Sequence, residues 1–198
     1  MASLTRWHLL RHAPIAPPWQ GRIIGRTDAD AELPADPQPR PPRWPSNATW
    51  IVTPLQRTQQ TALWLGAEAN RWHVVPELAE QDHGDWEGGR WTELLSQDPE
   101  ARAYFEAYDV RRPPQGESLR EVQIRCVEAF ERLSRDFAGR DLVAVLHAGP
   151  IRCILAHALS FPLSSALKLS IEPLSLTRLT GTHGSWQVEG VNVPLGRP

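Results

Sequence analysis

Three short apolar runs along the chain have the length and composition of buried strands. They cover residues 7–10, 49–52 and 142–146. A continuous apolar run of about four to eight residues is typical of a strand that is covered on both faces, as in a parallel sheet. Because parallel strands need crossover connections, usually helices, the pattern favours an α/β fold.

Helical patterns lie between and after these runs. Apolar residues recur at near-helical spacing over 118–138, which predicts an amphipathic crossover helix that leads into the strand at 142–146. Further helices are predicted over 57–68, 150–159 and 91–109, the last with a new start at Asp98-Pro99. We expect this last stretch to form a small helical cap whose aromatic residues mainly pack in its core.

The rest of the chain completes the expected architecture. A short strand is predicted at 73–75, and alternating residues over 174–179 and 186–188 predict a hairpin. The prolines within 14–45 exclude a helix or central strand there and indicate an ordered loop. The predicted fold is a three-layer α/β sandwich with a mostly parallel central sheet flanked by helices. We expect one domain over 1–198, with a cap insertion at about 82–116.

Charge and composition exclude several classes of protein. The 21 Lys and Arg balance 23 Asp and Glu, so no basic stripe for nucleic acid is indicated. Cys126 and Cys153 are too few for a disulfide framework and suit small buried side chains. The sequence contains neither a signal-peptide core nor a membrane span, so we expect a cytoplasmic protein without a membrane partner.

Candidate chemistry appears where the apolar runs end. Arg11 and His12 directly follow the first run, and His147 directly follows the run at 142–146. Arg57 comes shortly after the run at 49–52, in the first turn of a predicted helix. Open α/β sheets carry their reactive groups beyond the carboxyl ends of the strands. We therefore expect these four side chains to meet in one site.

Two histidines and two arginines together predict a site for phosphate. Arginine presents a planar fork of donors that matches phosphate oxygens. The helix position of Arg57 is mildly unfavourable unless an anion joins it there, although a solvated surface residue is the alternative. The other histidines, at 8, 73, 83, 157 and 183, are scattered and predict no metal centre.

Several separated blocks resemble one known family. They are Leu10-Arg11-His12-Ala13, the segment 53–62, Leu78-Ala79-Glu80 with 84–88, the segment 146–152, and Pro114-Gln115-Gly116-Glu117-Ser118 with Arg125. The first four of these blocks, in their order along the chain, resemble the histidine phosphatase superfamily, also called phosphoglycerate mutase-like, and the last block adds to the resemblance. The block Trp86-Glu87-Gly88 is similar to the branch of α-ribazole phosphatase and small broad-specificity phosphatases.

The resemblance implies a role for each candidate. His12 would be the nucleophile that forms a phosphohistidine, while Arg11, Arg57 and His147 would bind the phosphate oxygens. An acid in the block that contains Glu80 would protonate the leaving group, with Asp82 and Glu87 as rivals. Further substrate contacts are expected from Arg22, Trp19 and Ala148. No cofactor and no metal ion is then required.

The chain departs from the family pattern on one side of the site. Positions that are polar or Gly in the family hold Ala13, Ile15, Pro18 and Ile24, while Arg22, Gly25 and Asp28 still match. A Pro-rich stretch at 33–45 replaces another family segment. We expect an apolar, preformed wall there, with Trp19 in it, that favours esters with a bulky leaving moiety.

Three functions remain open at this point. Hydrolysis of a small phosphate monoester, such as an α-ribazole phosphate-like compound, is favoured. Phosphoryl transfer of the phosphoglycerate mutase type would use the same catalytic residues, but the mutases of this resemblance are generally longer. A non-catalytic phosphate-binding regulator is the third reading, which Glu80 argues against. The sequence leaves a homodimer open.

Overall fold

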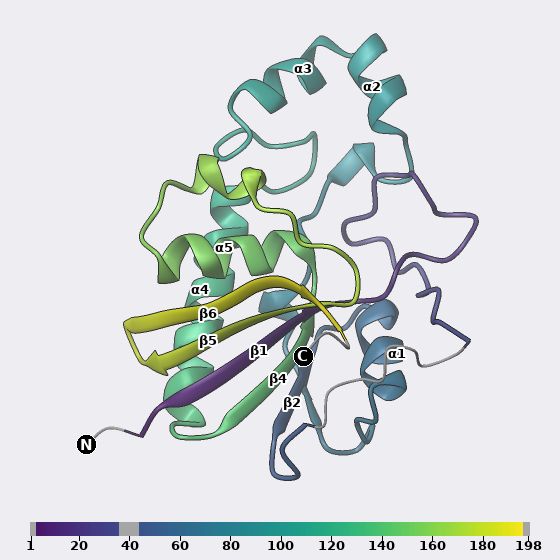
Figure 1. Cartoon of the computed structure of the whole chain (residues 1–198). Coiled ribbons are helices and arrows are strands. Elements are labelled where there is room, and N and C mark those ends of the chain that lie inside the picture. The colour runs from purple at the N-terminus through teal and green to yellow at the C-terminus, as the bar shows by residue number, and fades with distance from the viewer. Residues whose placement is uncertain (1–2, 36–43, 196–198) are drawn as a thin grey trace.

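A six-stranded sheet forms the centre of the computed structural model, which describes residues 3–35 and 44–195 (Figure 1). The strands are β1 (Thr5–Arg11), β2 (Thr49–Val52), β3 (Trp72–Val74), β4 (Asp141–Leu146), β5 (Ser175–Thr182) and β6 (Ser185–Pro194). Their order across the sheet is β3-β2-β4-β1-β5-β6. The first four in this order pair in parallel, whereas β5 is antiparallel to both of its neighbours. The predicted mostly parallel sheet and the predicted hairpin are confirmed.

Helices cover both faces of this sheet. They are α1 (Gln56–Trp64), α2 (Trp91–Gln97), α3 (Pro99–Glu106), α4 (Leu119–Asp136) and α5 (Ala148–Ala158), with 3-10 turns η1 (Pro76–Leu78), η2 (Gly84–Trp86) and η3 (Leu163–Lys168). Leu9 and Ala144 belong to a core shared with α4 and α5. Leu10 and Val145, one residue further along each strand, belong to a core shared with α1. This alternation produces the three layers that the apolar runs predict.

Helix α4 follows from a local sequence signal at its start. The Ser118 hydroxyl accepts a hydrogen bond from the Glu121 amide, and the Glu121 carboxylate accepts one from the Ser118 amide. This reciprocal pair is a capping box, which satisfies backbone donors that the first helical turn leaves free. The predicted apolar face is buried, with Val122, Cys126 and Phe130 fully enclosed.

The cap is built from α2 and α3, which lie at the top of the molecule, apart from the sheet (Figure 1). A helix break falls at Asp98, whose side chain accepts a hydrogen bond from the Glu100 amide and so begins α3. Trp86, Ala101 and Tyr104 form a small core of their own beneath these helices. That residues 1–198 form one domain, with the cap inserted at about 82–116, stays a prediction.

Some predicted boundaries are wrong. Helix α1 ends at Trp64 instead of residue 68, because Gly66 adopts a left-handed backbone with φ of 92° that terminates the helix. Helix α5 begins at Ala148, two residues before Pro150, which the first turn accommodates because no backbone donor is needed there. Residues 36–43 of the predicted Pro-rich stretch at 33–45 lie outside the part of the chain that the structure describes. Among the described helices, none has the length and hydropathy needed to cross a bilayer.

A buried polar contact between β1 and α4 generates the first testable prediction. The Trp7 indole N–H donates to the Ser134 hydroxyl at 2.9 Å, and both side chains are buried. In Ser134→Ala the indole donor is left unsatisfied, which should lower the free energy of unfolding by about 1–3 kcal/mol in chemical denaturation. Ser96→Ala is the control, because its exposed hydroxyl only donates back to the Glu93 carbonyl. Equal small losses in both variants would contradict the expectation.

Candidate active site

The two histidines meet because their strands are neighbours. In the parallel pair β1 and β4, Arg11 lies opposite Leu146, so the residues that follow, His12 and His147, leave the same edge of the sheet. The His12 amide continues the ladder by donating to the Leu146 carbonyl at 3.0 Å. The two imidazole rings are 5.1 Å apart between centroids. Thr53, which follows β2, hydrogen-bonds His147 Nε2 at 3.0 Å.

His12 is held in the form of a nucleophile. Its Nδ1 lies 2.6 Å from the Ala13 carbonyl oxygen, and since a carbonyl only accepts, Nδ1 must carry the hydrogen. Burial lowers the pKa of His12 to about 3, and the charge of Arg57 acts in the same direction. The ring is therefore neutral near pH 7, with the lone pair on Nε2. Burial and the Arg57 charge also hold the pKa of His147 well below its usual range.

The two arginines bring positive charge to the site without forming an ion pair there. Arg57 is only 1% exposed and donates to the carbonyls of Thr27 at 2.9 Å and Gly25 at 2.7 Å. Arg11 donates to the Ile171 carbonyl, and the Nε of each guanidinium is buried without a hydrogen-bond partner. Neither arginine forms an ion pair with another described residue. The solvated alternative for Arg57 is wrong, and the pair forms a site suited to an anion.

Burial also shifts the protonation equilibria of these arginines. Desolvation lowers the pKa of both Arg11 and Arg57, while the nearby Glu80 carboxylate acts in the opposite direction. Guanidinium groups nevertheless remain charged in proteins, because their ordinary pKa is so high. The site therefore keeps two positive charges beside a neutral His12.

A cavity of about 200 Å³ lies in front of this cluster. It is lined by Arg11, His12, Ile15, Arg22, Ile23, Ile24, Glu80, His83 and Trp91. Four predicted site residues are thus brought together at its surface: Arg11, His12, Arg22 and Glu80. His147 and Arg57 do not line it but are buried close to His12, whose pKa responds to Arg57.

Two predicted substrate contacts lie outside the cavity lining. Successive turns, in which the Trp19 amide donates to Ala16 and the Arg22 amide to Trp19, fold the loop back at this point. The Trp19 ring consequently lies beside Gly88 instead of facing the cavity. Ala148 is buried as the first residue of α5. Of the residues expected in the apolar wall, Ile15 and Ile24 line the cavity together with Ile23, whereas Trp19 does not.

Glu80 faces the cavity from the segment after η1. Its carboxylate accepts hydrogen bonds from the Gln81 amide at 3.0 Å and from the Gly149 amide, in the first turn of α5, at 3.3 Å. A Cβ on Gly149 would lie only 2.3 Å from Glu80 Oε1, so only glycine allows this approach. The Gly149 amide, at the start of α5, is therefore used by Glu80.

The rival acids have other partners. The Glu87 carboxylate accepts hydrogen bonds from Thr27, Arg26 and His83, which hold its pKa below the ordinary value although burial alone would raise it. Asp82 accepts from the Gly84 amide at 2.8 Å, and neither Asp82 nor Glu87 lines the cavity. Of the three acids, only Glu80 lines the cavity.

His83 and Trp91 are lining residues that the sequence did not single out as such. The His83 ring packs edge-on against Trp91 with centroids 5.5 Å apart, and burial lowers its pKa. The signal for His83 was its position three residues after Glu80 in an irregular segment. Trp91 gave no such signal, because an aromatic residue at a helix start suits core packing equally well.

Metal ligation finds no support among the side chains that the structure describes. Residues 3–35 and 44–195 contain no group of three His, Cys, Asp or Glu residues placed to hold a metal ion. The scattered histidines have separate partners, since His8 pairs with Asp141 at 3.2 Å and His157 with Glu131 at 2.7 Å.

Comparison with known proteins identifies the family. Residues 41–194 match the model of the histidine phosphatase superfamily (branch 1). The chain belongs to this superfamily. It is 32% identical to a metal-independent phosphoserine phosphatase of Arabidopsis thaliana, over 50% of this chain and 44% of that protein. An adenosylcobalamin/α-ribazole phosphatase of Salmonella typhimurium is 27% identical over 62% of this chain and 61% of that protein.

These superfamily relatives extend beyond the matched region. The chain spans less than half the length of the two Arabidopsis thaliana proteins it matches, a phosphoserine phosphatase and a phosphoglycerate mutase-like protein. Among solved structures, the α-ribazole phosphatase of Shigella flexneri superposes with a TM-score of 0.81 at 20% identity, covering 98% of this chain and 99% of that one. At this identity the likeness concerns the fold.

The buried neutral His12 makes a prediction about stability and pH. The unfolded chain binds a proton on this histidine below about pH 6.5, whereas the folded chain does so only near pH 3. The stability that depends on the neutral ring is therefore complete above about pH 6.5 and is lost as the pH falls towards 3. Chemical denaturation should give a free energy of unfolding that decreases on acidification, with up to about 1.4 kcal/mol per pH unit from this group.

His12→Asn should make that decrease shallower. His73→Asn is the control, because His73 is exposed on β3 and should leave the pH dependence unchanged. An unchanged slope in His12→Asn would show that the buried ring is not the source.

Proposed function

We propose that the protein hydrolyses phosphate monoesters through a phosphohistidine on His12. The observation that carries this proposal is a neutral histidine, with its Nε2 lone pair free, beside the guanidiniums of Arg11 and Arg57, which form no ion pair with any residue that the structure describes. A phosphate dianion supplies the missing negative charge. His12 lines the cavity, so Nε2 can reach the phosphorus of an anion that is bound there.

In the first step, His12 Nε2 attacks phosphorus in line with the leaving oxygen. The N–P bond forms while the bond between phosphorus and the ester oxygen breaks. Arg11 and Arg57 stabilise the charge on the equatorial oxygens, and His147, held by Thr53, contributes a polar contact. The side chain of Arg22, which donates to the Gly88 carbonyl at 2.6 Å, adds positive charge at the cavity wall.

Glu80 transfers protons in both steps. A protonated Glu80 donates to the leaving oxygen, which departs as the alcohol. The resulting carboxylate then accepts a proton from water as that water attacks the phosphohistidine, which releases inorganic phosphate and restores His12. The position of Glu80 at the cavity supports this role, whereas Glu87 is already saturated with donors.

This mechanism places no demand on a metal ion. Two guanidiniums supply the positive charge that divalent cations supply in metal-dependent phosphoryl transfer. The name of the Arabidopsis thaliana relative, a metal-independent phosphoserine phosphatase, is consistent with this.

The substrate we propose is a small phosphate ester with an apolar or aromatic leaving moiety, such as an α-ribazole phosphate-like compound. One wall of the cavity consists of Ile15, Ile23 and Ile24, and Trp91 adds an aromatic face. The isoleucine side chains favour the burial of an apolar group and themselves offer no hydrogen bond to a carboxylate such as that of 3-phosphoglycerate, which could pair only with the arginines of the lining. This argument favours hydrolysis of such esters over the mutase reading, and retention of Glu80 at the cavity favours catalysis over a purely regulatory role.

Phosphohistidine formation tests the mechanism directly. Wild-type protein treated with a labelled phosphate donor and quenched should carry an acid-labile, base-stable label, and it should turn over p-nitrophenyl phosphate. His12→Ala should lose both, because no nucleophile remains, while His73→Ala should keep both. Added EDTA should leave the rate unchanged. Label on His12→Ala would refute the assignment, and a rate restored only by added metal would refute the metal-free mechanism.

Substrate preference tests the role of the cavity wall. We expect a kcat/KM at least about tenfold higher for 2-phenylethyl phosphate than for 3-phosphoglycerate, equivalent to roughly 1.4 kcal/mol. Trp91→Ala should narrow this ratio, because Trp91 lines the cavity. Trp19→Ala is the matched comparison and should leave the ratio unchanged. The reverse pattern would place Trp19 at the substrate, as the loop sequence indicated.

A further inference from the structure

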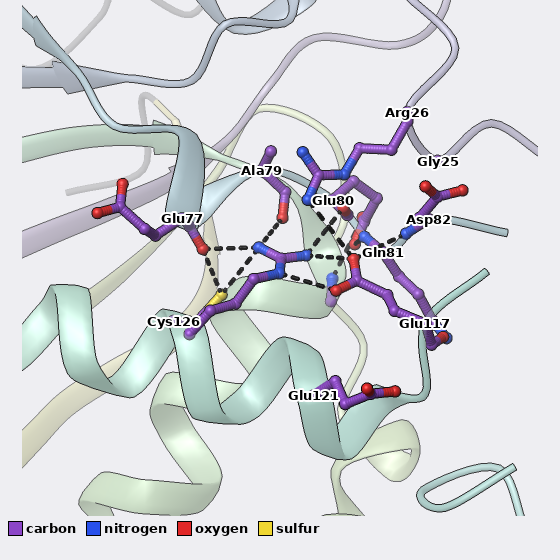
Figure 2. A network of polar contacts seen from close by, with 12 residues as sticks. Gly25, Arg26, Glu77, Ala79, Glu80, Gln81, Asp82, Glu117, Glu121 and Cys126 are labelled. Carbon is purple, nitrogen blue, oxygen red and sulfur yellow. Dashed lines mark hydrogen bonds and ion pairs between the residues drawn. The ribbon is translucent and has the colours of Figure 1, made fainter. Parts of the chain in front are cut away.

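A single arginine on α4 holds the backbone that carries Glu80. The Arg125 guanidinium donates from Nη1 to the carbonyls of Glu77 at 2.6 Å and Ala79 at 2.7 Å, and from Nη2 to the carbonyl of Glu80 at 3.0 Å. Figure 2 shows the Glu77 and Ala79 carbonyl groups directed towards the guanidinium at the centre of the network, and the Glu77 carbonyl also accepts from the Cys126 thiol at 3.3 Å. The segment after η1 has no regular secondary structure of its own here, so these contacts fix its path.

Glu117 completes the network from the other side. Its carboxylate accepts two hydrogen bonds from Arg125, from Nε at 3.0 Å and from Nη2 at 2.6 Å. The same carboxylate accepts the Asp82 amide at 2.9 Å, and the Glu117 amide donates to the Asp82 carbonyl at 3.0 Å (Figure 2). The backbone is thus held just before Glu80 by Arg125 and just after it by Glu117.

The pair is well placed to be rigid. Both side chains are 19% exposed, and the two-point geometry of guanidinium and carboxylate is the strongest form of ion pair. Hydrogen bonds and charge from Glu117 raise the pKa of Arg125 against the effect of burial, and those from Arg125 lower the pKa of Glu117. The pair therefore stays ionised across the neutral range.

The network is also tied to the other partner of Glu80. The capping box of Ser118 begins α4 immediately after Glu117, and α4 packs against α5. Helix α5 supplies the Gly149 amide that receives the Glu80 carboxylate. Backbone and carboxylate of Glu80 are therefore held by two helices that are packed together.

We propose that Glu117 and Arg125 are positioning residues that fix the Glu80 carboxyl group at the leaving-group side of the cavity. This inference rests on the proposed role of Glu80 as the proton donor. Neither residue lines the cavity, so both act through Glu80 and not on the substrate. Displacement of a reacting group by about 1 Å can reduce a rate roughly 10²-fold, so a loosened acid should be visible in kinetics.

The dependence on the leaving group separates positioning from general damage. In Glu117→Gln and Arg125→Lys, kcat for an alkyl phosphate should fall by about tenfold or more, because an alkoxide cannot leave without a proton. For p-nitrophenyl phosphate, whose leaving group needs little protonation, the fall should be less than about threefold. Inhibition by vanadate should stay as in the wild type, because the arginine and histidine contacts to phosphate are untouched.

A double-mutant cycle makes the test independent of folding. If Glu117 acts through Glu80, then adding Glu117→Gln to Glu80→Gln should not reduce kcat for the alkyl phosphate further. Additive losses in the double variant would overturn the proposal. So would equal losses on alkyl and aryl esters in the single variants Glu117→Gln and Arg125→Lys.

Glu131→Gln is the matched control. Glu131 is another glutamate of α4, and its carboxylate accepts hydrogen bonds from Trp186 at 2.9 Å and Gly184 at 3.2 Å. These partners do not belong to the network of Arg125 and Glu117. It should lower the melting temperature without changing the ratio of alkyl to aryl rates. A changed ratio in this control would overturn the proposal, because any loosening of α4 would then suffice.

Failure of the proposed function gives a different result. In that case the wild type itself would lack turnover of phosphate esters, or Glu80→Gln alone would show equal losses on both esters. If Glu80→Gln shows the leaving-group split and Glu117→Gln does not, only the positioning role is refuted.

Discussion

The parallel pairing of β1 with β4 is the contact on which the site depends. It brings together residues more than a hundred positions apart, and the hydrogen bond from the His12 amide to the Leu146 carbonyl extends it to the first residue beyond the strand. A slip of one residue in this register would turn every side chain of the strand to the opposite face. Thr53, after β2, and the first turn of α5 lie at the same edge. One edge of the sheet therefore sets the positions of His12, His147 and Thr53.

The second constraint is the burial of charge. A folded chain normally pairs a buried guanidinium with a carboxylate, because an isolated buried charge is costly. Here Arg57 is oriented instead by two neutral carbonyl groups, of Gly25 and Thr27, which hold the fork without cancelling its charge. The polypeptide thereby accepts a cost in stability and keeps a positive field at the place where we propose that the phosphate binds.

Much of this could be predicted from the sequence, because strands and their ends have local signals. The apolar runs predicted β1, β2 and β4, the helical spacing of apolar residues predicted α4, and the residues after the strands predicted the places of His12 and His147. Contacts made by irregular segments could not be predicted in the same way. The direction of Trp19 depends on two consecutive turns, and the approach of Glu80 to Gly149 depends on how α5 packs. Neither is encoded in a periodic pattern, so the sequence could not show that Trp91, and not Trp19, lines the cavity.

Gly25 has a consequence for how this cavity could change. Its Cα lies so close to the segment opposite that a Cβ there would be 2.0 Å from the Gln81 carbonyl oxygen. The two walls, one containing Ile24 and the other Glu80 and His83, therefore touch through main-chain atoms at this point. The width of the cavity is fixed by backbone against backbone, while its polarity is fixed by the side chains that project beyond. Substitutions among those side chains can thus change the polarity of the pocket while its dimensions stay the same.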